Sequence, residues 1–163
     1  MTFNPQAYAG TRAENEELLL SQLRHLIEDE PYRIANLANA SALLRGYLED
    51  INWVGFYLLD GDTGGLVLGP FQGLPACVRI PLGKGVCGTS AAKRETLRVP
   101  DVHASPGHIA CDAASCSEIV LPLYDAAGEL IGVLDTDSPL PDRFSEDDQR
   151  LLERFNALLT QYL

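Results

Sequence analysis

The spacing of apolar residues predicts two amphipathic helices at the start of the chain. Apolar side chains recur three and four positions apart between residues 19 and 27, and a second helical pattern runs from residue 34 to residue 48. Thr11 is followed three residues later by Glu14, which is the spacing of a capping box. We therefore expect residues 1–10 to form a tail or arm and residues 11–163 to form one domain.

The middle of the chain has shorter apolar runs that are typical of strands. Turn-forming residues separate these runs, and a short helix is expected at about residues 86–94. Ser145 then precedes an acidic first turn and a last apolar stripe, which predicts a capped closing helix. The predicted fold class is α+β, with helices packed on one face of a mostly antiparallel sheet of about six strands. The six runs are WVGFYLL, LVLGPFQG, ACVRIPL, LRVPD, SEIVLPLY and ELIGVLDTD.

The net charge of the chain argues against nucleic acids and anionic membranes as binding partners. The formal net charge is −11, which repels nucleic-acid phosphates and anionic membrane surfaces. The first residues have neither the basic nor the apolar region of a signal peptide, so we expect a cytoplasmic protein. The four cysteines are then interpreted as thiols rather than as a disulfide framework.

Each cysteine has more than one interpretation. Cys77 alternates with apolar residues on a predicted strand, which is typical of an inert core thiol. Cys87 lies at the start of the predicted short helix, where the helix dipole could lower its pKa, but the small residues that follow it fit a closely packed thiol equally well. Cys111 follows a polar loop that contains His108, and a nearby histidine would favour its thiolate. Cys116 is either a further reactive thiol or a bystander.

The loop between residues 101 and 118 also raises the question of a metal. It contains four residue types that zinc accepts, with the spacing H-x4-H-x2-C-x4-C: His103, His108, Cys111 and Cys116. That spacing matches no standard structural zinc site, and we expect no metal. The run from Gly83 to Gly88 fits G-x-G-x-x-G, but we interpret it as a tight turn before a helix, because dinucleotide binding requires a parallel βαβ unit.

Three carboxylates and two aromatic residues complete the candidate site. Asp135 and Asp137 alternate along one strand and therefore share a face, and Glu118 opens another apolar strand. They are either a solvated strand end or a cluster that raises its own pKa values and binds an ammonium group. Trp53 and Tyr57 also share a strand face, as core residues or as the apolar wall of a pocket.

Four segments together resemble the free methionine-R-sulfoxide reductases, which are stand-alone GAF-domain enzymes. The segments are NWVGFYLL, LGPFQGLPACVRIPLGKGVCG, DVHASPGHIACDAASCSEIVLPL and IGVLDTDSP. The resemblance extends from about residue 52 to residue 139 and includes cysteines at the family's separations, at Cys77, Cys87 and Cys111. It implies a single GAF domain that reduces free L-methionine (R)-S-oxide.

The resemblance also assigns roles to individual residues. Cys111 would attack the sulfoxide sulfur and become a sulfenic acid, Cys77 would resolve it as a disulfide, and Cys87 would be an additional thiol in recycling. Glu118, Asp135 and Asp137 would bind the amino acid and help to protonate the departing oxygen. Trp53 and Tyr57 would enclose the methyl and thioether end of the substrate.

The same resemblance implies that thioredoxin reduces the disulfide and that no bound cofactor is needed. A homodimer through the N-terminal arm and first helix is possible but not required. Two positions depart from the family: Cys116 is not among its catalytic positions, and Thr136 stands where isoleucine is more usual. A ligand-binding GAF sensor and a structural zinc domain remain as alternative functions.

Overall fold

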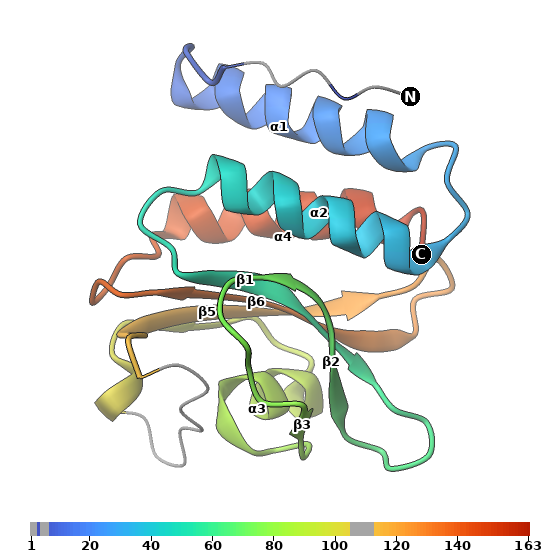
Figure 1. Ribbon diagram of the computed structural model, residues 1–163, viewed down its shortest axis with the longest axis vertical. Coiled ribbons are helices and arrows are strands. Elements are labelled where there is room, and N and C mark those ends of the chain that lie inside the picture. Colours follow the sequence, from blue (N-terminus) through green and yellow to red (C-terminus); the bar gives the residue numbers. More distant parts are fainter. Residues whose placement is uncertain (1–2, 4–6, 105–112) are drawn as a thin grey trace.

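A six-stranded sheet forms the framework of the protein (Figure 1). The computed structural model describes residue 3, residues 7–104 and residues 113–163 of the chain. Its strand order is β3-β2-β1-β6-β5-β4, and each neighbouring pair is antiparallel. The strands are β1 (Trp53–Leu59), β2 (Leu66–Gln72), β3 (Arg79–Ile80), β4 (Leu97–Val99), β5 (Ser117–Tyr124) and β6 (Leu130–Ser138).

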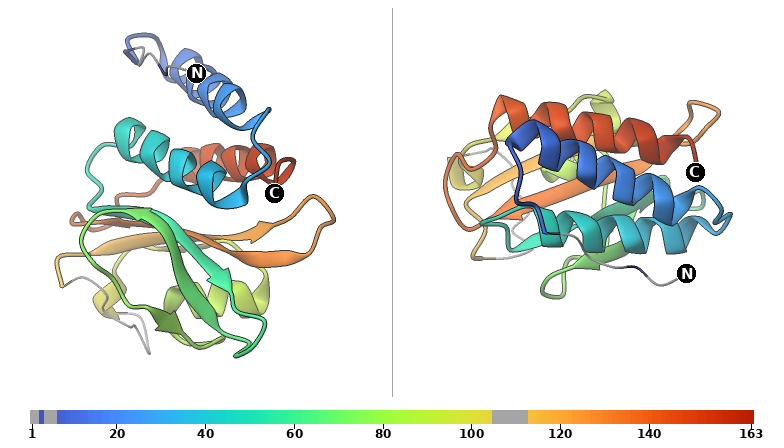
Figure 2. Two further views of the ribbon diagram at one scale, coloured as in Figure 1. Left: turned by 45° about the vertical axis from the view of Figure 1, so that its right-hand side comes forward. Right: turned by 90° about the horizontal axis from the view of Figure 1, so that it is seen from above.

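Three long helices cover one face of this sheet, which confirms the predicted α+β class. They are α1 (Arg12–Ile27), α2 (Arg33–Tyr47) and α4 (Glu146–Thr160). Helices α2 and α4 lie on the sheet, and α1 lies on top of them (Figures 1 and 2). The main apolar core fills the space between these helices and the sheet, and it includes Leu23, Leu44, Phe56, Leu121 and Phe155. No helix among the described residues is long and apolar enough to cross a membrane.

The predicted helix starts are confirmed by their hydrogen bonds. Thr11 and Glu14 form a reciprocal capping box at the start of α1. Ser145 caps α4 in the same way with Asp148. Asp148 also binds the guanidinium groups of Arg12 and Arg143, at 3.2 and 2.9 Å. This carboxylate therefore joins the first and last helices to the loop that follows β6.

The opposite face of the sheet carries a smaller apolar cluster and the short helix α3 (Gly85–Lys93) (Figure 1). Gly88 lies so close to the preceding turn that an added Cβ would be 2.3 Å from the carbonyl oxygen of Pro81. Only glycine permits this approach, and Gly83 N–H also donates to the carbonyl of Gly88. Since the surrounding sheet is antiparallel, the glycine run is a turn and helix start, as expected.

One strand is shorter than predicted. Cys77 was expected on a strand, but β3 contains only Arg79 and Ile80. Cys77 lies just before it and is half-buried. Its carbonyl accepts a hydrogen bond from the hydroxyl of Tyr57 instead of a partner strand. Pro75, which has no N–H, lies in the same non-strand segment.

Thr136 provides a test of this packing. Its side chain is fully buried on the helical face of β6, and its hydroxyl has no hydrogen-bond partner among the described residues. An unsatisfied buried hydroxyl costs about 1–3 kcal/mol. We therefore expect Thr136→Val to raise the free energy of unfolding by about 1 kcal/mol, measured by urea denaturation.

The matched control is Thr89→Val in α3, where the hydroxyl donates to the carbonyl of Gly85. This variant loses a hydrogen bond and should be destabilised by about 1 kcal/mol. Equal effects of the two substitutions would show that the Thr136 hydroxyl is satisfied in solution.

Candidate active site

The register of three neighbouring strands brings the predicted site residues to one face of the sheet. In the paired strands Glu118 lies opposite Asp137, and Asp137 lies opposite Trp53. Asp135 and Tyr57 are two and four positions from members of this row, so they project from the same face. This is the face that carries α3, away from the three long helices. All five residues predicted to bind substrate are therefore neighbours in space.

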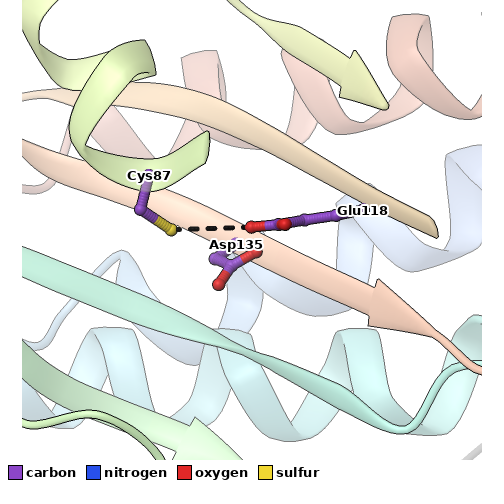
Figure 3. A group of neighbouring side chains, drawn as sticks. All are labelled: Cys87, Glu118 and Asp135. Atoms are coloured by element: carbon purple, nitrogen blue, oxygen red, sulfur yellow. Dashed lines mark hydrogen bonds between the residues drawn. The ribbon is translucent and has the colours of Figure 1, made fainter. Parts of the chain in front are cut away.

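Helix α3 adds a thiol to this surface. Cys87, the third residue of the helix, points towards β5 and β6 and donates a hydrogen bond of 3.8 Å to Glu118 Oε1 (Figure 3). Ligand atoms of Cys87, Glu118 and Asp135 all lie within 4.8 Å of one another. The three residues are 4%, 6% and 5% exposed, respectively. Glu118 and Asp135 are thus buried groups and not part of a solvated strand end, whereas Asp137 is half-buried.

Burial and mutual repulsion control protonation in this cluster. Burial, together with the charges of Asp135 and Asp137, raises the pKa of Glu118 well above its usual value. Burial also raises the pKa of Asp135 to about 6, against hydrogen bonds that favour its ionised form. One carboxyl group in the cluster can therefore retain a proton near neutral pH and act as an acid.

The prediction that the helix dipole lowers the pKa of the Cys87 thiol is wrong in direction. Burial, and then the charges of Asp135 and Glu118, raise the pKa of its thiol well above the ordinary value. The helix dipole is outweighed because removal from water disfavours a thiolate more strongly than a partial charge favours it. Cys87 is therefore a protonated thiol at neutral pH, which makes it a poor first nucleophile.

The aromatic side of the site also holds the segment that carries Cys77. The rings of Trp53 and Tyr57 stack with centroids 5.8 Å apart, and Phe71 stacks on Trp53 at 5.2 Å. Trp53 Nε1 donates to the carbonyl of Leu74 at 3.1 Å, and the Tyr57 hydroxyl donates to the carbonyl of Cys77 at 3.0 Å. The aromatic wall and the backbone beside Cys77 are thus fixed by the same two side chains.

Phe71 was missed by the sequence analysis. The signal was present, because Phe71 lies in a predicted strand that follows β1 across a turn, and strands so connected usually pair. In the structure Phe71 lies opposite Gly55, which has no side chain to separate the Phe71 ring from Trp53. The hydrogen bond to the Cys77 carbonyl had no sequence signal.

The structure describes only some of the histidines and cysteines in the loop between residues 101 and 118. Cys111 and His108 lie outside the described residues. His103 is exposed in a short 3-10 turn, Val102–Ala104, where its N–H donates to Asp101. Cys116 is half-buried and its thiol lies 3.9 Å from the carbonyl oxygen of Ala114. The role of Cys111 as nucleophile stays a prediction, and the expectation that this loop holds no metal is not tested by the described residues.

Comparisons with known proteins place this arrangement in a family. Residues 20–163 match the GAF domain. The chain is 56% identical over 138 residues to the free methionine-R-sulfoxide reductase of Escherichia coli. This match covers 85% of this chain and 82% of that protein. It is 43% identical over 151 residues to the enzyme of the same name from Saccharomyces cerevisiae, covering 90% and 83% of the two chains.

A solved structure gives the same result. The chain superposes with a TM-score of 0.90 on the free methionine-R-sulfoxide reductase of Neisseria meningitidis, solved in complex with its substrate. The two are 43% identical, and the match covers 98% of this chain and 94% of the other. The chain belongs to the free methionine-R-sulfoxide reductases of the GAF-domain family. Its membership confirms the resemblance of the four sequence segments.

The raised pKa of Asp135 predicts a stability change with pH. The folded protein holds this proton more tightly than the unfolded chain, so the cost of ionising Asp135 grows as pH rises from the ordinary carboxyl pKa to about 6. We therefore expect Asp135→Asn to stabilise the ligand-free protein more at pH 7.5 than at pH 4.5, by about 2 kcal/mol. Urea unfolding at both pH values measures the difference.

Asp148→Asn is the matched control. Burial of Asp148 opposes its ionisation, but hydrogen bonds from Ser145 and the charge of Arg143 hold its pKa below the ordinary value. Its contribution to stability is present above the ordinary carboxyl pKa and is lost only as pH falls below it. The control should therefore be destabilised by a similar amount at both pH values, and a pH-independent Asp135→Asn effect would contradict the buried-acid assignment.

Proposed function

We propose that this protein reduces free L-methionine (R)-S-oxide to L-methionine by thiol chemistry. The observation that carries the proposal is the single sheet face on which three carboxylates, a thiol and an aromatic stack meet. Membership of the free methionine-R-sulfoxide reductases supports the same reaction. The relative from Neisseria meningitidis was solved in complex with its substrate.

Each end of the substrate has matching chemistry in the site. Carboxylates of Glu118, Asp135 and Asp137 attract the α-ammonium group, which a methionine within a protein chain lacks. The stacked rings of Trp53 and Tyr57 offer an apolar surface to the methyl and thioether end. Selectivity for the free amino acid follows from this pairing, because a peptide-bound substrate would leave the buried carboxylates without a cation.

The first chemical step requires a nucleophile and an acid together. The Cys111 thiolate attacks the sulfoxide sulfur, and a carboxylic acid of the cluster protonates the sulfoxide oxygen. The hydroxyl then passes from the substrate sulfur to the Cys111 sulfur as the bond between the two sulfurs breaks, which leaves methionine and a sulfenic acid on Cys111. The raised pKa values of Glu118 and Asp135 supply a proton donor near neutral pH. Cys87 is a poor candidate for this step because its own pKa is raised.

The second step regenerates the enzyme. The Cys77 thiol attacks the sulfur of the sulfenic acid, water leaves, and a Cys77–Cys111 disulfide forms. Thioredoxin, as an external dithiol, then reduces this disulfide, and Cys87 serves as an additional thiol in recycling. Cys77 suits a resolving role because it is half-buried beside the aromatic wall, and its backbone is held by Tyr57. We expect the protein to act in the cytoplasm, where thioredoxin is kept reduced.

The decisive experiment compares the R and S sulfoxides of free methionine. Wild-type protein with a thioredoxin system should consume the R form and leave the S form almost unchanged. Cys111→Ser should lose activity by more than about 1,000-fold, because removing a nucleophile removes the covalent path. Product methionine is measured by chromatography.

Two results would overturn the proposal. Full activity of Cys111→Ser would remove the proposed nucleophile. Tight binding of a small ligand without turnover of either sulfoxide would favour a GAF sensor.

Cys77→Ser separates the two chemical steps. We expect this variant to form about one equivalent of methionine in a burst and then to turn over slowly with thioredoxin, because sulfenic acid forms but is not resolved. Rapid-quench measurement of methionine gives the burst, and a sulfenic-acid reagent detects the intermediate. Cys116→Ser is the matched control and should cycle as the wild type does. Unimpaired cycling of Cys77→Ser would assign resolution to another thiol.

A further inference from the structure

The proposed reaction gives roles to Glu118 and Asp135, but it does not explain why the thiol of Cys87 lies against these two carboxyl groups. The cluster of these three residues places one sulfur and two carboxyl groups around a common point in a buried position (Figure 3). We propose that this cluster is a binding site for a zinc ion, which occupies the position of the substrate ammonium group and thereby inhibits the enzyme. The binding itself does not rest on the proposed function, whereas the inhibition does.

The spacing of the ligand atoms suits zinc. Tetrahedral zinc with one sulfur and two oxygen ligands at ordinary bond lengths places those atoms about 3.4–3.6 Å apart. In the protein, Cys87 Sγ and Glu118 Oε1 are already 3.8 Å apart, and the ligand atoms of all three residues lie within 4.8 Å. Small side-chain rotations therefore convert the cluster into a three-ligand site with a fourth position open.

An unsatisfied atom in the cluster points to a missing ligand. Asp135 is 5% exposed, and although its carboxyl group has hydrogen bonds from Cys87, Glu118 and the backbone of Thr136, its Oδ1 atom has no partner among the described residues. A buried carboxylate oxygen without a partner is costly and therefore calls for an explanation, such as an unseen ion. A cation beside Asp135 would satisfy this atom.

The ligand types select among metals. A thiolate sulfur favours zinc over magnesium or calcium, which prefer oxygen ligands in larger numbers. A doubly charged ion also neutralises a thiolate and two carboxylates better than a single ammonium group does. When zinc binds, the Cys87 thiol and any protonated carboxyl group of the cluster lose their protons to solvent, and the sulfur and carboxylate oxygens bond to the metal. No change of oxidation state is involved.

The test isolates Cys87 from the other thiols. When the chain carries Cys77→Ser, Cys111→Ser and Cys116→Ser together, Cys87 is the one cysteine left of the four in its sequence. We expect this protein to bind one zinc ion in calorimetric titration. Cobalt used as a probe should give a near-ultraviolet thiolate-to-metal band and the visible bands of a tetrahedral site.

Ligand variants decide the assignment. Cys87→Ser in this background should abolish the thiolate band and weaken zinc binding by at least about 100-fold, since even residues that only orient a metal ligand contribute 10- to 100-fold. Asp135→Asn and Glu118→Gln, which preserve shape, should each weaken binding by about 10-fold or more. Asp62→Asn is the control, because this exposed carboxylate lies in the turn between β1 and β2, and it should bind zinc unchanged.

Absence of zinc binding in the Cys87-only protein would overturn the site, as would a cobalt spectrum that Cys87→Ser leaves unaltered. Circular dichroism confirms that each variant is folded before it is titrated. The same protein lacks the proposed nucleophile, so the free R-sulfoxide should bind without reacting and should displace zinc. Bound zinc that the sulfoxide cannot displace would uphold the metal site and contradict the proposed position of the ammonium group.

Discussion

The site depends on keeping two carboxyl groups and a thiol out of water at one point on the sheet. Charged forms of such groups are strongly disfavoured in a buried position, so the ligand-free cluster holds protons that exposed side chains would release. The same arrangement makes the cluster receptive to a cation, because a bound positive charge reverses the repulsion. Protonation of the cluster and binding of a cation are therefore alternative ways of removing the same repulsion between its negative charges.

The apolar core on the other face of the sheet offsets the free-energy cost of burying these polar groups. Nearly all of the large apolar core lies between the sheet and the helices α1, α2 and α4, while the site face has a smaller cluster under α3. Along each strand, side chains alternate between the core face and the site face, so neighbouring residues either pack in the core or line the site. On β6, Leu134 and Thr136 face the main core, whereas Asp135 and Asp137 face the site. A shift of one residue in register would exchange these sets and bury the carboxylates under the helices.

Local patterns predicted those parts of the structure that depend on local physics. The pair Asp135 and Asp137 shares a face because strands have a period of two, and Thr11 caps a helix because its hydroxyl and Glu14 satisfy nearby amides. The contact between Cys87 and Glu118 joins residues 31 positions apart, and no local pattern sets that distance. The pKa of Cys87 was mispredicted for the same reason, since burial is a property of the assembled fold.

In the proposed cycle, the aromatic wall would link substrate binding to the position of Cys77. Trp53 and Tyr57 stack on the site face of the sheet, and their polar atoms donate to the backbone carbonyls of Leu74 and Cys77. A substrate pressed against these rings would therefore rest on the same side chains that hold the Cys77 segment. Because the rings are stacked and buried, neither can move without disturbing the other. Fixing the Cys77 carbonyl through Tyr57 would hold the backbone of this segment in the proposed cycle, so that resolution would require movement of the thiol rather than of the segment that carries it.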